Sequence, residues 1–203
     1  MTDIDAPEPR QGFADRLSHW LGWTDAISLA DALDGGAMAP PARPSAASRP
    51  AASAAERECT RVRAALTKTL ADHAAAARAG DTATDFPAFH RRYLAKQQAM
   101  ELAVAPLRAR MRAALAARSP ALARLAAVDA VMEKMLGPRE RSLLHSVPAL
   151  LEKHFERLRQ AEPDARADGW LAVFGNDMQA VLRAELEIRM QPVEGLLDAL
   201  RIS

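Results

Sequence analysis

Residues 86–111 read FPAFHRRYLAKQQAMELAVAPLRARM, and their pattern predicts a long helix. Similar side chains recur in steps of three and four, as they do on one face of a helix with 3.6 residues per turn. The resulting stripe is narrow and keeps a seven-residue rhythm through Phe86, His90, Tyr93, Gln97, Met100, Val104, Leu107 and Met111. Such a stripe is typical of a coiled-coil-like helix pair rather than of a wide core face.

A second narrow stripe precedes it in residues 54–79, through Cys59, Val62, Leu66, Leu70, His73 and Ala77. Because residues 80–84 begin with a glycine, we expect the two helices to fold back antiparallel about this turn. The expected pairs are Leu70 with Tyr93, Leu66 with Gln97, and Cys59 with Val104.

The same register brings His73 opposite His90, as a metal-binding or proton-sensing pair would require. A metal site needs further ligands, and none is evident nearby, so two solvated histidines are the favoured interpretation. No metal site is predicted.

The composition points to one fold class. Of 203 residues, 46 are alanine and only 4% are aromatic, and runs of strand-forming residues are absent, so we predict an all-α protein. Hydrophobic residues make up 49% of the chain, enough for a real core. Twenty-seven basic residues against 26 acidic ones exclude a polybasic protein, and the single Cys59 excludes a disulfide framework.

Three regions are predicted along the chain. Residues 1–36 form short N-terminal helices, residues 37–53 form a disordered Ala/Pro/Ser linker, and residues 54–203 form the helical hairpin and a bundle. Thr24 is the expected N-cap of the second short helix.

Prolines and glycines set the expected boundaries within the bundle. Ser119 and Pro120 should open a helix that ends at Gly137-Pro138, and the next helix should run over residues 139–160, with a kink at Pro148. Pro106 should bend the long helix or restart it. The final apolar stripe, residues 170–200, is interrupted by Pro192 and Gly195.

The sequence contains no signature of an enzyme class. It has no nucleotide-binding glycine loop, no zinc-hydrolase pair of histidines and no paired Glu-x-x-His units of a di-iron bundle. We therefore predict no catalytic, cofactor-binding or metal-binding residue and no enzyme activity. The start of the chain lacks the features of a signal peptide, and no apolar run is long enough to span a membrane, so a cytoplasmic protein without direct membrane insertion is expected.

Two binding hypotheses come from the residues. Phe13, Trp20 and Trp23 lie on the N-terminal helices, which either fold back onto the bundle or bind a protein partner. Arg108 and Arg112 share one helix face and are the candidates for a nucleic-acid alternative. A solvated charged face is the favoured interpretation there, and also for Glu185 and Arg189. Self-association through the narrow stripes is a further prediction.

Two stretches carry a family resemblance: FADRLSHWLGWTDAISL at residues 13–29, and GWLAVFG at residues 169–175, followed by LRAELEIRMQPVEGLLDAL at residues 182–200. They resemble an uncharacterised proteobacterial family, the domain-of-unknown-function family numbered three-three-four-eight. Members tend to be encoded near proton-channel proteins of the MotA/TolQ/ExbB type and near OmpA-like peptidoglycan-binding proteins. The resemblance implies an accessory to an envelope complex, and it implies no activity or site residue. Similar proteins often carry additional residues before Thr2, which leaves open a start upstream of Met1.

Together these observations predict a non-enzymatic helical adaptor or assembly protein with one or more protein partners. The partners include membrane-associated proteins if the resemblance holds, or a second copy of the chain. The alternative is a nucleic-acid-associated helical protein that uses the arginine-rich hairpin.

Overall fold

The computed structural model describes residues 22–34, 48–78, 85–161 and 167–202, and almost all of them are helical. No strand occurs in these ranges, so the predicted all-α class is confirmed. The helices are α2 (Trp23–Asp34), α3 (Ser48–Arg78), α4 (Phe86–Ala116), α5 (Pro120–His145), α6 (Val147–Ala161) and α7 (Ala167–Ile202).

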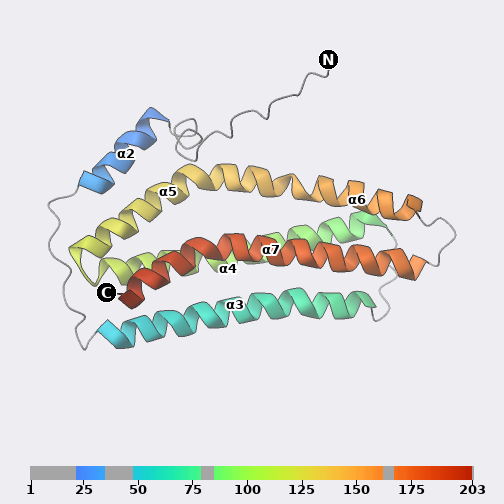
Figure 1. Ribbon diagram of the computed structural model, residues 1–203, viewed down its shortest axis with the longest axis horizontal. Coiled ribbons are helices and arrows are strands. Elements are labelled where there is room, and N and C mark those ends of the chain that lie inside the picture. Colours follow the sequence, from blue (N-terminus) through green and yellow to red (C-terminus); the bar gives the residue numbers. More distant parts are fainter. Residues whose placement is uncertain (1–21, 35–47, 79–84, 162–166, 203) are drawn as a thin grey trace, which may run out of the picture.

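The long helices run side by side along one axis (Figure 1). α5 and α6 follow one another end to end as one layer of the bundle, and α2 packs beside α5. α4 and α7 touch each other, and both also touch α3, α5 and α6, so these two helices are central to the bundle.

The core follows α7 because its apolar residues repeat at helical spacing over its whole length. Its fully buried members include Phe174, Leu186, Met190, Val193 and Leu200. The stripe predicted for residues 86–111 supplies the facing surface, with Tyr93, Met100, Leu107 and Met111 at most 1% exposed.

One end of the core is aromatic. Phe155 of α6 stands edge-on to Phe174 and Trp170 of α7, with ring centroids 5.0 Å apart in both pairs. Phe86 and Phe89 of α4 complete the group. Edge-to-face packing of this kind adds stability beyond the burial of area alone.

α3 and α4 run in opposite directions in Figure 1. Lys96 donates to the Thr69 carbonyl at 3.0 Å, and Arg110 pairs with Glu58 at 2.7 Å, so later residues of α4 meet earlier residues of α3. The individual pairs expected for the hairpin and its coiled-coil character stay predictions, because both helices also pack against α7. The side chain of His73, and with it the expected pair with His90, lies outside the described residues.

The predicted linker, residues 37–53, was drawn too long. α3 begins at Ser48, so the last six residues of the predicted linker are helical. Pro50 falls in the first turn, where its missing N–H is not needed, and the alanines after it are strong helix formers. The rest of the linker, residues 37–47, lies outside the described residues.

The helix end predicted at Gly137-Pro138 was wrong. α5 continues through Pro138 to His145, and the break comes at Ser146, with Pro148 in the first turn of α6. Gly137 is buried in the interior of α5 and does not cap a helix.

Pro106 and Pro192 also lie inside continuous helices, α4 and α7, and do not end or restart them. A proline frees the carbonyl four residues earlier. For Pro106 this carbonyl belongs to Leu102, and for Pro192 it belongs to Ile188. These two residues are 68% and 49% exposed, so water can donate a hydrogen bond to each carbonyl.

Of the two predicted N-caps, Ser119 is confirmed and Thr24 is not. Ser119 accepts a hydrogen bond from the Leu122 amide at 3.2 Å, as a side-chain N-cap does. α2 begins one residue before Thr24, and the Gly22 carbonyl accepts from the amides of Asp25 and Ala26.

Truncating the aromatic end tests this core. Phe155→Ala removes a side chain that is 1% exposed, and we expect it to lower the free energy of unfolding by about 3–5 kcal/mol in urea denaturation followed by circular dichroism. The matched control, Leu102→Ala on an exposed position, should change it by about 0.5 kcal/mol or less. Equal effects of the two substitutions would contradict the described packing.

Candidate functional site

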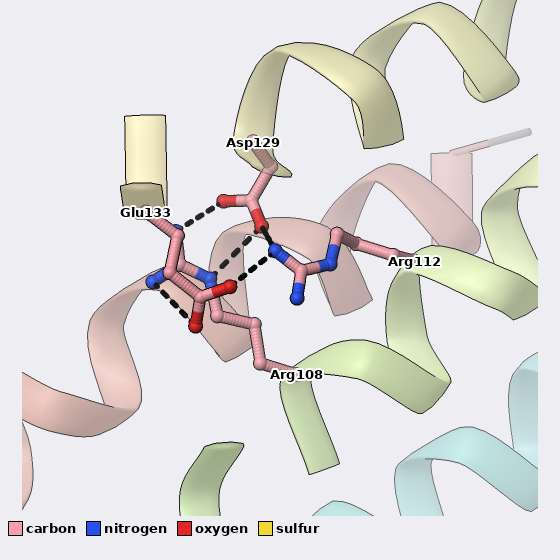
Figure 2. Close-up of polar contacts among 4 residues, drawn as sticks. All are labelled: Arg108, Arg112, Asp129 and Glu133. Carbon is pink, nitrogen blue, oxygen red and sulfur yellow. Dashed lines mark hydrogen bonds and ion pairs between the residues drawn. The ribbon is translucent and has the colours of Figure 1, made fainter. Parts of the chain in front are cut away.

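The two arginines predicted as a nucleic-acid site lie in a compact ionic cluster between α4 and α5 (Figure 2). Arg108 binds the carboxylate of Asp129 with two donors, Nε at 2.9 Å and Nη2 at 2.6 Å. Arg112 donates from Nη1 to Glu133 at 2.6 Å and to Asp129 at 3.3 Å. Two cations therefore face two anions.

This arrangement corrects the interpretation of a solvated face. The side chains of Arg108 and Arg112 are only 13% and 18% exposed, and their charges are matched within the protein. Arg110, on the other side of α4, pairs with Glu58 of α3. The signal in the sequence was the matching spacing, since both the arginines and their carboxylates stand four residues apart.

A second polar cluster is buried at the centre of the bundle. Glu185 of α7 is 2% exposed, so its predicted place among surface charges was wrong. Tyr93 and Gln97 of α4 donate to one carboxylate oxygen at 2.7 and 3.0 Å. Arg189 donates to the other oxygen from Nε and Nη2, at 3.0 and 2.8 Å. Every acceptor site of this buried charge is used, as its burial requires.

The cluster also reaches a third helix. Gln97 Nε2 donates to the Leu144 carbonyl of α5 at 3.2 Å. Burial, reinforced by the hydrogen bond to the Glu185 carboxylate, raises the pKa of Tyr93 well above its ordinary value. The phenol is therefore held in its neutral, donating form.

Cys59 lies in an open groove of about 720 Å³ between α3 and α7. Burial, together with the nearby charge of Glu194, raises the pKa of its thiol, which makes it a poor nucleophile at neutral pH. Arg63 in the same groove already binds Glu187 and Glu194, at 2.6 and 2.7 Å. The charge of Arg63 is therefore compensated within the protein.

The histidines form no metal site in the described part of the chain, where no group of three or more His, Cys, Asp or Glu residues could hold an ion. His154 contacts Asp177 through Nε2 at 2.7 Å and accepts from Arg157 at Nδ1 at 2.8 Å. His90 stacks on Phe86.

One apolar surface was missed in the sequence. Leu143 of α5 and Leu150 of α6 are 63% and 60% exposed. Leu125 is 40% exposed on the same side of α5, and half-buried apolar residues lie between it and Leu143 at helical spacing: Val128, Met132 and Leu136. We call these six residues the α5–α6 flank. The break at Ser146, between α5 and α6, is absent from the predicted boundaries.

The predicted partner-binding residues are placed only in part. Phe13 and Trp20 lie outside the described residues, and of Trp23 only the backbone, at the start of α2, is described. α2 itself packs against α5, while its Ile27 and Leu33 are 49% and 60% exposed. No described helix is long and apolar enough to cross a membrane.

The buried phenol gives a direct test, because Tyr93 is the only tyrosine. In urea, tyrosinate absorbance should rise with a midpoint at about pH 10. In the folded protein we expect no ionisation there, and the signal should appear only together with loss of the helical circular dichroism. Because the folded state favours the protonated phenol, the tyrosine contributes stability that is lost as pH rises above the ordinary value. A midpoint near that of the unfolded chain, with helicity intact, would contradict the burial.

The cluster of Figure 2 can be tested by a double-mutant cycle on Arg108→Ala and Asp129→Ala. We expect a coupling free energy of about 1–3 kcal/mol, since the pair is bidentate and largely buried. The exposed pair Glu156 and Arg159 is the matched control, for which about 0.5 kcal/mol or less is expected. Equal coupling in the two cycles would show that the Arg108 pair is solvated after all.

Comparison with known proteins assigns the family. Residues 1–202 match the family described as "Protein of unknown function (DUF3348)", and this range contains both stretches on which the resemblance was based. No curated protein and no solved structure matches the chain. The chain therefore belongs to the DUF3348 family.

Proposed function

We propose that the protein is a cytoplasmic, non-enzymatic helical adaptor or assembly protein that binds a protein partner on the α5–α6 flank. The observation that carries this proposal is the exposure of Leu143 and Leu150, 63% and 60%, on successive helices that also carry the exposed Leu125. Grouped apolar residues on a surface mark interaction sites more often than single exposed ones do.

The neighbouring helix indicates what kind of partner fits. α2 lies beside α5 and uses the same layer of the bundle as its support. A helix whose apolar face is laid on a neighbouring helix is a recurrent form of peptide recognition. A partner that presents an amphipathic helix would continue this packing over Leu143 and Leu150.

The bundle suits a scaffold. The buried Glu185 cluster and the Arg108 cluster connect α7, α4 and α5 through hydrogen bonds, so the support of the flank is held in one arrangement. Partner binding to a preorganised surface avoids part of the entropy cost of association.

The resemblance extends the proposal to the identity of the partner. Family members tend to be encoded beside envelope proton-channel and OmpA-like proteins, so a membrane-associated protein of that kind is the partner we propose. The alternative to such a partner is a second copy of the chain. The nucleic-acid alternative receives no support, because Arg108 and Arg112 are engaged by Asp129 and Glu133.

Affinity recovery from native cytoplasmic and membrane extracts tests this proposal, with the full chain and with a Leu143→Glu/Leu150→Glu variant. We expect proton-channel components among the proteins recovered by the unchanged chain, and about tenfold less of them with the variant, a loss of about 1.4 kcal/mol of binding free energy. Leu102→Glu, on the exposed face of α4, should leave the recovery unchanged.

Three results would overturn the proposal. They are equal recovery with the flank variant, recovery of nucleic acid in its place, and recovery of the chain alone. Circular dichroism of each variant shows whether the bundle is intact.

A further inference from the structure

We propose that α2 of one copy of the chain docks in the groove between α3 and α7 of a second copy. This surface uses other helices than the α5–α6 flank, so the inference goes beyond the proposed function. Three features of the described residues support it: an open groove, a row of unpaired cations beside that groove, and a helix whose outer side is both apolar and acidic.

The groove lies between α3 and the last turns of α7 and measures about 720 Å³. Its α3 wall includes Thr60, Ala64, Thr67 and Ala71, which recur in steps of four and three and therefore share one face of the helix. Because these side chains are small, another helix can approach α3 closely there. Residues 60–71 span about 18 Å of helix, which is also the length of the 12-residue α2.

A row of cations borders the groove on the outer side of α3. Arg57, Arg61 and Lys68 are exposed and spaced to share one face of the helix. Within the described ranges, none of the three forms an ion pair. The acids nearest to them in the sequence, Glu56 and Glu58, are each bound by an arginine of another helix. This row therefore keeps its positive charge.

The acids of the opposite wall, on α7, are already engaged. Glu194 binds Arg63 at 2.7 Å, and Asp198 binds Arg201 at 2.9 Å. Lys68 lines the same groove and has no such partner among the described residues, so the groove and its border together are positive. The occupant that this surface fits has an apolar face with negative charges beside it.

The outer side of α2 has this pattern. Ile27 and Leu33 are exposed, and Ala30 lies between them on the same side of the helix. Asp31 and Asp34 are exposed next to this apolar side, and α2 contains no basic residue. The half-buried side chains of α2 lie on its other side, where the helix packs on α5. α2 can therefore bind a second surface without leaving the first.

The two surfaces lie on opposite sides of the bundle. In Figure 1, α2 lies beside α5, and α3 lies at the opposite edge. Two copies therefore cannot exchange both helices through one twofold interface. Each added copy leaves one α2 and one groove free, as in a heterologous assembly that grows beyond a dimer. A single short helix buries little area, so we expect weak association that depends on concentration.

Sedimentation equilibrium of the purified full chain at several concentrations tests the inference. We expect the weight-average mass to rise past that of a dimer, and to rise less at high salt, which screens exposed charges. Arg61→Glu/Lys68→Glu should weaken association at least about tenfold, and so should Asp31→Lys/Asp34→Lys. The chain that combines all four substitutions should associate again, because its two surfaces regain opposite charges. Mixing the two double variants should also restore association, since each supplies one unchanged surface.

Four results would overturn the inference. They are the mass of a monomer at every concentration, a mass that stops at a dimer, unchanged association of either charge variant, and failure of both the combined chain and the mixture to associate. All four substituted side chains are exposed, and circular dichroism shows whether each variant is folded.

The outcome can be separated from that of the proposed function. Leu143→Glu/Leu150→Glu should leave the mass unchanged, and loss of association in that variant would assign the contact between copies to the flank and overturn the inference. If no association occurs while partner recovery depends on Leu143 and Leu150, only the inference falls. If association follows the charge reversals and recovery does not depend on those leucines, only the proposed function falls.

Discussion

The buried carboxylate of Glu185 is the constraint on which the rest of the bundle depends. Its negative charge lies in the core and is stabilised by Tyr93, Gln97 and Arg189 together. A buried charge without such partners would be strongly destabilising, so α7 and α4 have to keep the register that joins them. Gln97 carries the same constraint to the α5 backbone at Leu144. Apolar packing around α7 supplies most of the stabilisation, and the polar cluster selects one arrangement of the helices.

The register of α5 then decides what the surface presents. Asp129 and Glu133 point toward α4 and bind Arg108 and Arg112, so these four charges are paired with one another inside the bundle. Apolar residues elsewhere on α5 stay exposed, Leu125 and Leu143 among them, and Leu150 is exposed on α6 after the break at Ser146. A scaffold with one apolar flank and an acidic helix already beside it is the physical basis of the proposed adaptor role.

Local patterns in the sequence predicted much of this fold and little of the site. The helical class, a long helix over residues 86–111 and the Ser119 cap depend on spacing and on neighbouring residues, and the structure confirms them. Glu185 was assigned to the surface because a glutamate four residues before an arginine, here Arg189, has the same sequence pattern on a surface and in a core. Only the contact with Tyr93 of another helix shows that this pair is buried. The boundary at Pro138 failed because a proline is tolerated where the freed carbonyl is exposed to water. The exposure of Leu143 depends on how α5 packs against the other helices, which local sequence does not fix.

The central claim is that α2 packs on α5 of a stable bundle without being part of the bundle's core. None of the described side chains of α2 is buried, whereas α7 is buried along its length. Native-state hydrogen exchange of the full chain measures this difference directly, because each amide reports the free energy of its local opening. We predict that the α2 amides exchange through local openings far faster than the amides around Glu185, which should exchange only on global unfolding. Equal protection of the two helices would contradict the account and make α2 a member of the core.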